Sequence, residues 1–273
     1  MAPAFKRVAP AVDPTSINVP LLGGGGRIQL GEQLVETVET CTCSMILAAC
    51  FCLAFWPVLL GLGVFAAEES GPFDPVELAA LRAFKASSGN SAELRSWTGD
   101  DPCREGALGW AGVSCEGVLR PTVTGLSLSG TQLTGTVPPE LGQLTALTSL
   151  QLANTQLSGT IPEALGQLPA LRFLDLHSTQ LTGTISPELG QLAALIDLFL
   201  YSTQLTGTIP DALGQLAALK QLSLDVTQLS GTIPEALGDL AALTWLGLSG
   251  TGVTGCPDLC SQHPRITTCR CPT

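Results

Sequence analysis

The chain has 273 residues, with 12 Lys+Arg against 23 Asp+Glu and a formal net charge of -11 at pH 7. Nucleic-acid binding needs a positively charged surface, so this balance argues against a DNA- or RNA-binding protein. Basic or neutral peptides, neutral glycans and cations stay compatible with it as partners.

Residues 1–39 hold a run of four glycines, several prolines and scattered charges, without a sustained hydrophobic period. Such composition is typical of a disordered tail. Residues 40–67 follow with 28 consecutive uncharged residues. A helix needs about 20 apolar residues to cross a bilayer, so we predict a transmembrane signal-anchor helix here. The alternative is a cleaved signal peptide whose site follows Ala66, with Val64 at the small −3 position.

Six of the ten cysteines lie beyond the apolar segment and flank a cysteine-free stretch: Cys103, Cys115, Cys256, Cys260, Cys269 and Cys271. An even number placed in this way predicts disulfides in an oxidising compartment. We therefore expect residues 1–39 in the cytosol and residues 68–273 outside the cell or in a lumen. The plasma membrane is the expected location of this single-pass protein.

The last four cysteines follow the spacing C-x3-C-x8-C-x-C, with His263 between them, which superficially suggests a zinc site. This spacing is not that of a standard zinc finger. We expect two disulfides in a cap over residues 256–273, and no metal. Four cysteines allow three pairings, and the spacing does not choose among them.

Residues 68–120 begin with a helix signal in the stretch DPVELAALRAFKASS. Asp74 suits the N-cap, Pro75 the first helical position, and Glu77 lies three residues after the cap. Leu78 and Leu81 give this helix an apolar face. We expect it to begin a cap in front of the segment that follows.

Residues 121–255 repeat with a period of 24, starting with the phrase TQLTGTVPPELGQL at Thr131, and make six rungs of which the last is truncated. Within each rung, LxxLxL alternates with the period of a short strand. One rung cannot bury its own leucines, so the rungs must stack as a set. The recurrent threonine hydroxyls are expected to satisfy backbone groups along the stacked turns: Thr131, Thr155, Thr179, Thr203, Thr227 and Thr251.

These rungs resemble the plant-type leucine-rich repeat, LxxLxxLxLxxNxLxGxIPxxLGxL, with threonine in place of the family's asparagine. The stretch SWTGDDPCREGALGWAGVSC is similar to the N-terminal cap of the same family, which implies a Cys103–Cys115 disulfide. The resemblance implies an α/β-type solenoid: a curved right-handed repeat array with a helical N-terminal cap and a Cys-rich C-terminal cap. The transmembrane helix would precede it.

The family includes the extracellular repeat domains of receptor-like kinases and receptor-like proteins, and polygalacturonase-inhibitor-like proteins. No HRD, DFG or VAIK motif is present, so we expect no kinase and no other enzyme activity. In the receptors the repeats precede the membrane helix, whereas here they follow the apolar segment.

The residues between the inward leucines are expected to line a concave sheet, because alternate strand residues face opposite sides. In the later rungs these positions become aromatic and acidic, which favours a ligand-binding patch over neutral drift. The predicted binding residues are Phe173, Asp175, His177, Asp197, Phe199, Tyr201, Gln221, Asp225 and Trp245. A metal or acid–base site at Asp175, His177 and Asp197 is the alternative, but an open sheet offers no oxyanion hole.

The sequence therefore predicts a non-catalytic, membrane-anchored recognition protein of receptor-like or co-receptor type, without a cofactor. Residues 121–255 carry nine Asp/Glu and two Lys/Arg, which favours a basic or neutral protein or peptide ligand. A co-receptor in the same membrane would carry the signal. The alternative is an inhibitor or structural adhesion protein that signal-peptide cleavage releases to the cell surface or medium.

Overall fold

The computed structural model describes residues 73–272, except residues 90, 104–108 and 118–120. The predicted tail (1–39) and the predicted membrane segment (40–67) lie outside the described residues. Within the described ranges, no helix is both long and apolar enough to cross a bilayer.

The N-terminal cap begins with α3 (Pro75–Ser87), whose start is as predicted. The Asp74 carboxylate accepts a hydrogen bond from the Val76 backbone N–H at 2.8 Å. Glu77 is buried and accepts from the backbone N–H of Val123, at 3.1 Å, in β2 (Thr122–Ser127). Glu77 therefore ties the helix to the first strand of the repeats.

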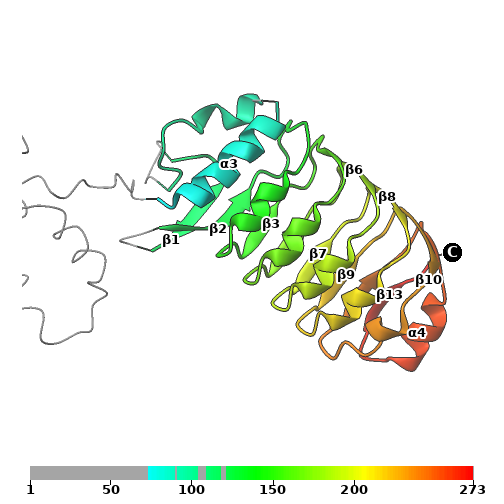
Figure 1. Cartoon of the computed structure of the whole chain (residues 1–273). Helices are drawn as coiled ribbons and strands as arrows, with labels where there is room; N and C mark the ends of the chain where they lie inside the picture. Colours follow the sequence, from blue (N-terminus) through cyan, green and yellow to red (C-terminus); the bar gives the residue numbers. More distant parts are fainter. Residues whose placement is uncertain (1–72, 90, 104–108, 118–120, 273) are drawn as a thin grey trace, which may run out of the picture. The chain divides into compact units, whose positions relative to one another are not determined.

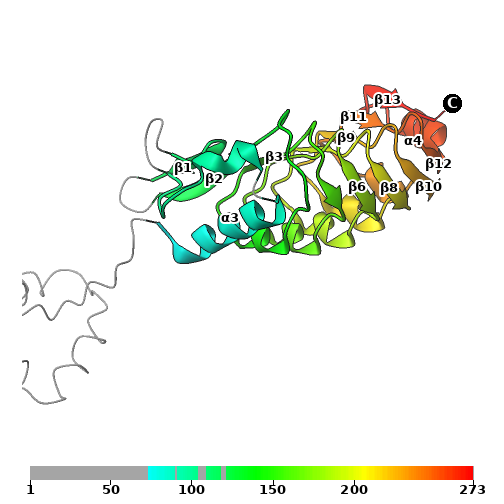
Figure 2. The ribbon, with the colours of Figure 1, turned by 90° about the horizontal axis from the view of Figure 1, so that it is seen from above.

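The rest of the cap consists of η1 (Ala92–Ser96) and β1 (Val113–Glu116), which pairs antiparallel with β2. Two buried indoles, Trp97 and Trp110, stack with ring centroids 5.0 Å apart. The Cys103–Cys115 disulfide is present, with 5.6 Å between the Cα atoms. Figure 2 shows α3 in line with the row of short helices that follows, so the cap closes the open end of the array.

The main sheet has eight strands in the order β1-β2-β3-β5-β7-β9-β11-β13. From β2 onward the strands are parallel, and Gly125 of β2 lies opposite Ser149 of β3, 24 residues later. The leucines between the solvent-facing positions, such as Leu150, are fully buried. The further strands are β3 (Ser149–Gln151), β5 (Phe173–Asp175), β7 (Asp197–Phe199), β9 (Gln221–Ser223), β11 (Trp245–Gly247) and β13 (Thr268–Arg270).

A second, five-stranded parallel sheet forms where the sequence predicted only turns. Its strands come from the TQLTG phrase, and Figure 1 shows β6, β8 and β10 side by side along the curved array. In order along the chain they are β4 (Ser158–Gly159), β6 (Gln180–Gly183), β8 (Gln204–Gly207), β10 (Gln228–Thr232) and β12 (Gly252–Thr254).

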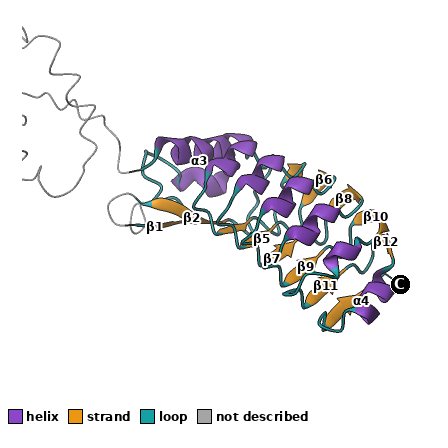
Figure 3. Ribbon diagram, turned by 60° about the horizontal axis from the view of Figure 1, so that its bottom comes forward, coloured by secondary structure: helices purple, strands orange, loops and turns teal. Residues whose placement is uncertain are grey.

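A row of short 3₁₀ helices, purple in Figure 3, comes from the segment that ends in LGxL in each rung. Leu213 and Leu216 are fully buried. Gly190 has no room for a side chain, because a Cβ there would collide with the backbone carbonyl of Ala212 in the next rung. The helices are η3 (Pro139–Gln143), η4 (Glu163–Gln167), η5 (Pro187–Gln191), η6 (Asp211–Gln215) and η7 (Glu235–Leu237).

The recurrent threonine hydroxyls do satisfy backbone groups, but within their own rung. Thr155 Oγ1 donates to the carbonyl of Leu152 at 2.8 Å, and Thr203 Oγ1 donates to the carbonyl of Leu200 at 2.8 Å. The other four threonines of this series make the same bond, three residues back, at 2.6–2.9 Å. The prediction of a role along the stacked turns is therefore corrected to a role inside each turn.

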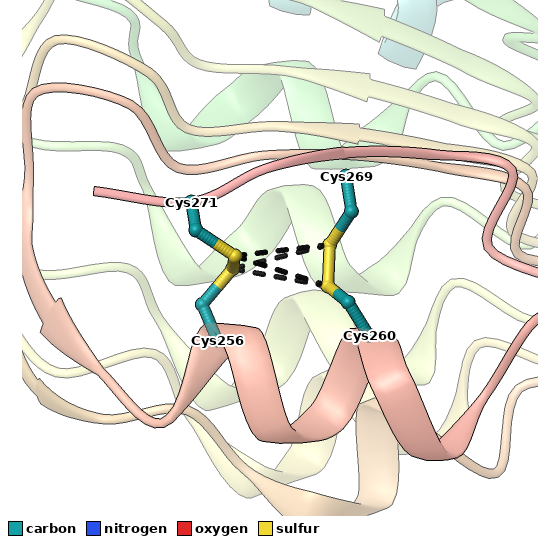
Figure 4. Close-up of side chains that lie close together, drawn as sticks. All are labelled: Cys256, Cys260, Cys269 and Cys271. Carbon is teal, nitrogen blue, oxygen red and sulfur yellow. Dashed lines mark hydrogen bonds between the residues drawn. A yellow bond between two sulfur atoms is a disulfide. The ribbon is translucent and has the colours of Figure 1, made fainter. Parts of the chain in front are cut away.

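The C-terminal cap consists of α4 (Cys256–Gln262) and β13. Its four cysteines form two disulfides, Cys256–Cys271 and Cys260–Cys269, which tie the helix to the last strand (Figure 4). We call these the two cap disulfides. All four sulfur atoms lie within 4.8 Å of one another. Metals bind cysteine as the thiolate, so the oxidised cluster does not offer a zinc ligand set.

Candidate functional site

The predicted binding residues lie on the solvent-facing side of four neighbouring strands of the main sheet, β5, β7, β9 and β11, and β13 extends this face by a fifth strand. One row across these strands consists, in register, of Asp175, Phe199, Ser223, Gly247 and Arg270. A parallel row lies two residues earlier on each strand, and the residues that follow the strands extend the face. Neighbouring strands are about 4.8 Å apart, so side chains of adjacent rungs are in contact range.

These strands carry a hollow of about 510 Å³, which we call the sheet hollow. Seven of the nine predicted residues line it, namely Asp175, His177, Phe199, Tyr201, Gln221, Asp225 and Trp245. Three further residues that line it were not among the predicted binding residues: Ser223, Val226 and Arg270. Phe173 and Asp197 belong to the same face but do not line the hollow, although the Phe173 ring packs edge-on against Phe199 at 5.6 Å.

One wall of the hollow is a stacked pair of rings. The imidazole of His177 lies 4.3 Å from the Tyr201 ring, at an interplanar angle of 9°. His177 Nδ1 lies 2.6 Å from Asp175 Oδ1, and Nε2 lies 2.9 Å from Asn154 Nδ2. A carboxylate only accepts, so Nδ1 donates and Nε2 accepts from the amide. This network assigns the neutral Nδ1–H tautomer and holds the ring in place.

The floor of the hollow is made of small residues over a buried carboxylate. Ser223 is 2% exposed and Asp225 is 8% exposed. Asp225 accepts from the Ser249 backbone N–H at 2.9 Å and from Ser223 Oγ at 2.8 Å. A Cβ at Gly247 would collide with the Asp225 carboxylate and with the indole of Trp245. The absence of a side chain at Gly247 therefore leaves room for the Asp225 carboxylate and the Trp245 indole to come close to each other.

The opposite wall is formed by Trp245 and Arg270, whose guanidinium carbon lies 6.0 Å from the indole centroid. Arg270 was missed because residues 256–273 were predicted as a cap and not as a strand of the sheet. The alternation in TTCRC was the available signal. Val226 is on the rim, 60% exposed, with a left-handed backbone φ of 54°.

The electrostatics of the face are set by its carboxyl groups. Burial raises the pKa of Tyr201, and the nearby charges of Asp175 and Asp225 raise it further. Burial also raises the pKa of Asp197, while Lys220 opposes that shift. Among the described residues, Asp197 Oδ1 has no hydrogen-bond partner although it is buried.

The structure does not assemble the alternative metal or acid–base site. Asp197 lies in register with Phe173 and Gln221, one row away from the Asp175–His177 pair. In the described part of the chain, the cap cysteines are the one group of three or more His, Cys, Asp or Glu side chains with ligand atoms close enough for a metal. Ser223 Oγ donates to Asp225 and not to a histidine.

Two family models match the chain. The model described as "Leucine rich repeat N-terminal domain" matches residues 74–116, and "Leucine rich repeat" matches residues 121–181. Among curated proteins, no match is found.

Solved structures of plant receptor ectodomains are similar to this chain. The SOBIR1 receptor kinase ectodomain from Arabidopsis thaliana is 30% identical, with a TM-score of 0.57, over 66% of this chain and 94% of that chain. The BIR2 ectodomain from the same plant is 32% identical, with a TM-score of 0.59, over 67% of this chain and 96% of that chain.

A longer relative is the ectodomain of the Arabidopsis thaliana membrane receptor kinase GASSHO1/SCHENGEN3, in complex with CASPARIAN STRIP INTEGRITY FACTOR 2. It is 34% identical, with a TM-score of 0.60, over 65% of this chain. This chain spans 21% of that receptor chain.

Proposed function

Because this chain belongs to the plant-type leucine-rich-repeat family, we propose that it is a non-catalytic recognition protein that binds a protein or peptide in the sheet hollow. The observation that carries the proposal is the hollow itself, where aromatic and acidic side chains from successive strands line one space. Peptide recognition uses such rigid aromatic walls with a few fixed polar groups.

The hollow is prepared for binding before any ligand arrives. Its side chains stand on strands of one hydrogen-bonded sheet, and the His177 ring is fixed by a stack and two hydrogen bonds. Little binding free energy is therefore spent on ordering the protein's side chains when a ligand binds. The partner in the GASSHO1/SCHENGEN3 structure supports a protein or peptide as the class of ligand.

The repeat domain is proposed to lie outside the cell, held at the plasma membrane by residues 40–67. The relatives are receptor ectodomains, and the three disulfides of the described residues agree with an oxidising compartment. Since the chain carries no kinase motif, a second membrane protein would transmit the signal.

Removal of the two large rings should abolish ligand capture. The double variant Tyr201→Ala and Trp245→Ala would be compared with the wild type in selection from a displayed random-peptide library. The matched control, Gln204→Ala and Gln228→Ala, changes two exposed side chains of the five-stranded sheet. We expect specific peptides with the wild type and the control, and none with the double variant. Equal enrichment on all three proteins would refute the proposed function.

A further inference from the structure

Asp225 is a buried carboxylate that forms no ion pair with another described residue. Its two hydrogen-bond donors, the Ser249 N–H and the Ser223 hydroxyl, are both neutral. Among the described residues, Arg82–Asp100 is the ion pair between an arginine or lysine and a carboxylate, and it does not involve Asp225. A buried charge is normally paired with an opposite charge, so the floor of the sheet hollow would be stabilised by a cation beside Asp225.

Asp175 adds a second carboxylate to the same space. One of its oxygens accepts from the imidazole Nδ1–H and from the backbone N–H of His177. A neutral imidazole fixes this carboxylate without cancelling its charge. Both carboxylates act on the Tyr201 hydroxyl, where each opposes further negative charge. Both carboxylates therefore lie close to the Tyr201 ring.

Aromatic faces border this negative region. Phe199 and Tyr201 lie on one side and Trp245 of β11 on the other, with Ser223 of β9 between them. A guanidinium or ammonium group gains from the face of an aromatic ring, and guanidinium also stacks on it. The space over Ser223, between Tyr201 and Trp245, is where such a group would meet both rings and the Asp225 carboxylate.

Val226 points independently to a ligand at this rim. At the equivalent place in other rungs, the left-handed residue is Gly130, Asn154, Ser178, Ser202 or Gly250. A β-branched residue is strained there, and Val226 is also largely exposed. Strain of this kind collects at ligand-binding positions. An exposed valine beside Asp225 suits the aliphatic stem of a long basic side chain.

Arg270 limits the site on its far side. Its guanidinium lies near one face of Trp245, so the ligand's charge has to approach from the side of Tyr201. Arg270 also opposes a second cation in the hollow. Removal of the Arg270 charge should therefore raise the affinity of the hollow for a cation, whereas removal of the Asp225 charge should lower it.

We propose that the sheet hollow holds a basic side chain of the ligand, arginine or lysine, between Tyr201 and Trp245, with Asp225 and Asp175 as its counter-charges. This inference rests on the proposed function and names the anchor by which the ligand is recognised. The general preference for a basic or neutral ligand thus becomes a specific one: this subsite requires a positively charged side chain.

The test uses two small probes that differ in charge and hardly in shape: N-acetylarginine amide and N-acetylcitrulline amide. Binding is followed by NMR titration of the purified protein. We expect the arginine probe to bind about tenfold tighter, the effect of one charge-assisted contact. Asp225→Asn should bring the two probes to similar affinity, and Arg270→Gln should widen their difference. Asp211→Asn, which removes an exposed aspartate in η6, should leave the ratio unchanged.

Asparagine retains an acceptor for the Ser249 N–H, so Asp225→Asn should keep the fold, and an unchanged circular dichroism spectrum checks this. Equal binding of the arginine and citrulline probes to the wild type would overturn the inference. So would library peptides that require Tyr201 and Trp245 but show no enrichment of arginine or lysine and no response to Asp225→Asn. In that second outcome peptides still bind in the hollow, so the proposed function would hold while the inference of a basic anchor would fail.

Discussion

Replacement of Val226 by asparagine should stabilise the protein, because this valine has a backbone conformation that its branched side chain disfavours. Its φ is 54°, in the left-handed region. That region costs an L-residue about 1–2 kcal/mol, whereas asparagine tolerates it through local hydrogen bonds. Since Val226 is 60% exposed, the apolar burial that is lost is less than about half of the 1.5–3 kcal/mol for a fully buried side chain.

The net gain expected for Val226→Asn is about 0.5–1 kcal/mol in the free energy of unfolding. For a domain of this size that corresponds to a rise in Tm of about 1–4 °C. Differential scanning calorimetry would measure the shift, with chemical denaturation as a second measurement. Val226→Thr is the matched control, because threonine is polar but keeps the branch at Cβ.

The threonine variant should melt within about 1 °C of the wild type, since it keeps the strained shape. An equal rise for threonine and asparagine would show that surface polarity, and not the backbone conformation, limits stability. No rise for asparagine would refute the assignment of strain to Val226.

Three further predictions concern a carboxyl group, a close packing contact and the cap. The raised pKa of Asp197 means that its ionised form disfavours the fold, so Asp197→Asn should raise Tm near neutral pH. This gain should vanish near about pH 3, below the ordinary aspartate pKa; a gain that persists there would contradict the charge argument. Gly190→Ala should cost about 1–3 kcal/mol by overpacking against Ala212, seen as a lower denaturant midpoint, and an unchanged midpoint would show that the rungs separate freely. Reduction of the two cap disulfides should make α4 and β13 protease-sensitive before the central rungs, and equal protection with and without reductant would refute a structural role for them.

Much of the repeat architecture follows from local patterns in the sequence. The leucine spacing predicted six of the eight strands of the main sheet, β2, β3, β5, β7, β9 and β11, and Asp74 with Pro75 predicted the start of α3. The second sheet was missed because its strands are short and end at a glycine, so the alternation of exposed and buried residues covers only three positions. Their pairing arises only when neighbouring rungs stack.

The sequence predicted which residues share the face of the candidate site, but not the burial of Asp225 or the presence of Arg270. Alternation placed most lining residues on one face, including Tyr201 and Trp245. Burial of Asp225 depends on contacts with the following rung through Ser249, and a strand pattern does not contain this information. Arg270 reaches the hollow only because β13 pairs with β11 after the helix of the cap. Arg270, 23 residues after its neighbour Gly247, had no signal in the period of 24.

The bond that each recurrent threonine makes to its own rung affects how this protein can change over generations. Thr203, for example, satisfies the carbonyl of Leu200 without help from a neighbour. If a copying error added or removed one whole repeat, no such hydroxyl would lose its partner. The length of the array can therefore vary while each unit stays internally complete, and the variable strand residues are free to diverge into new surfaces.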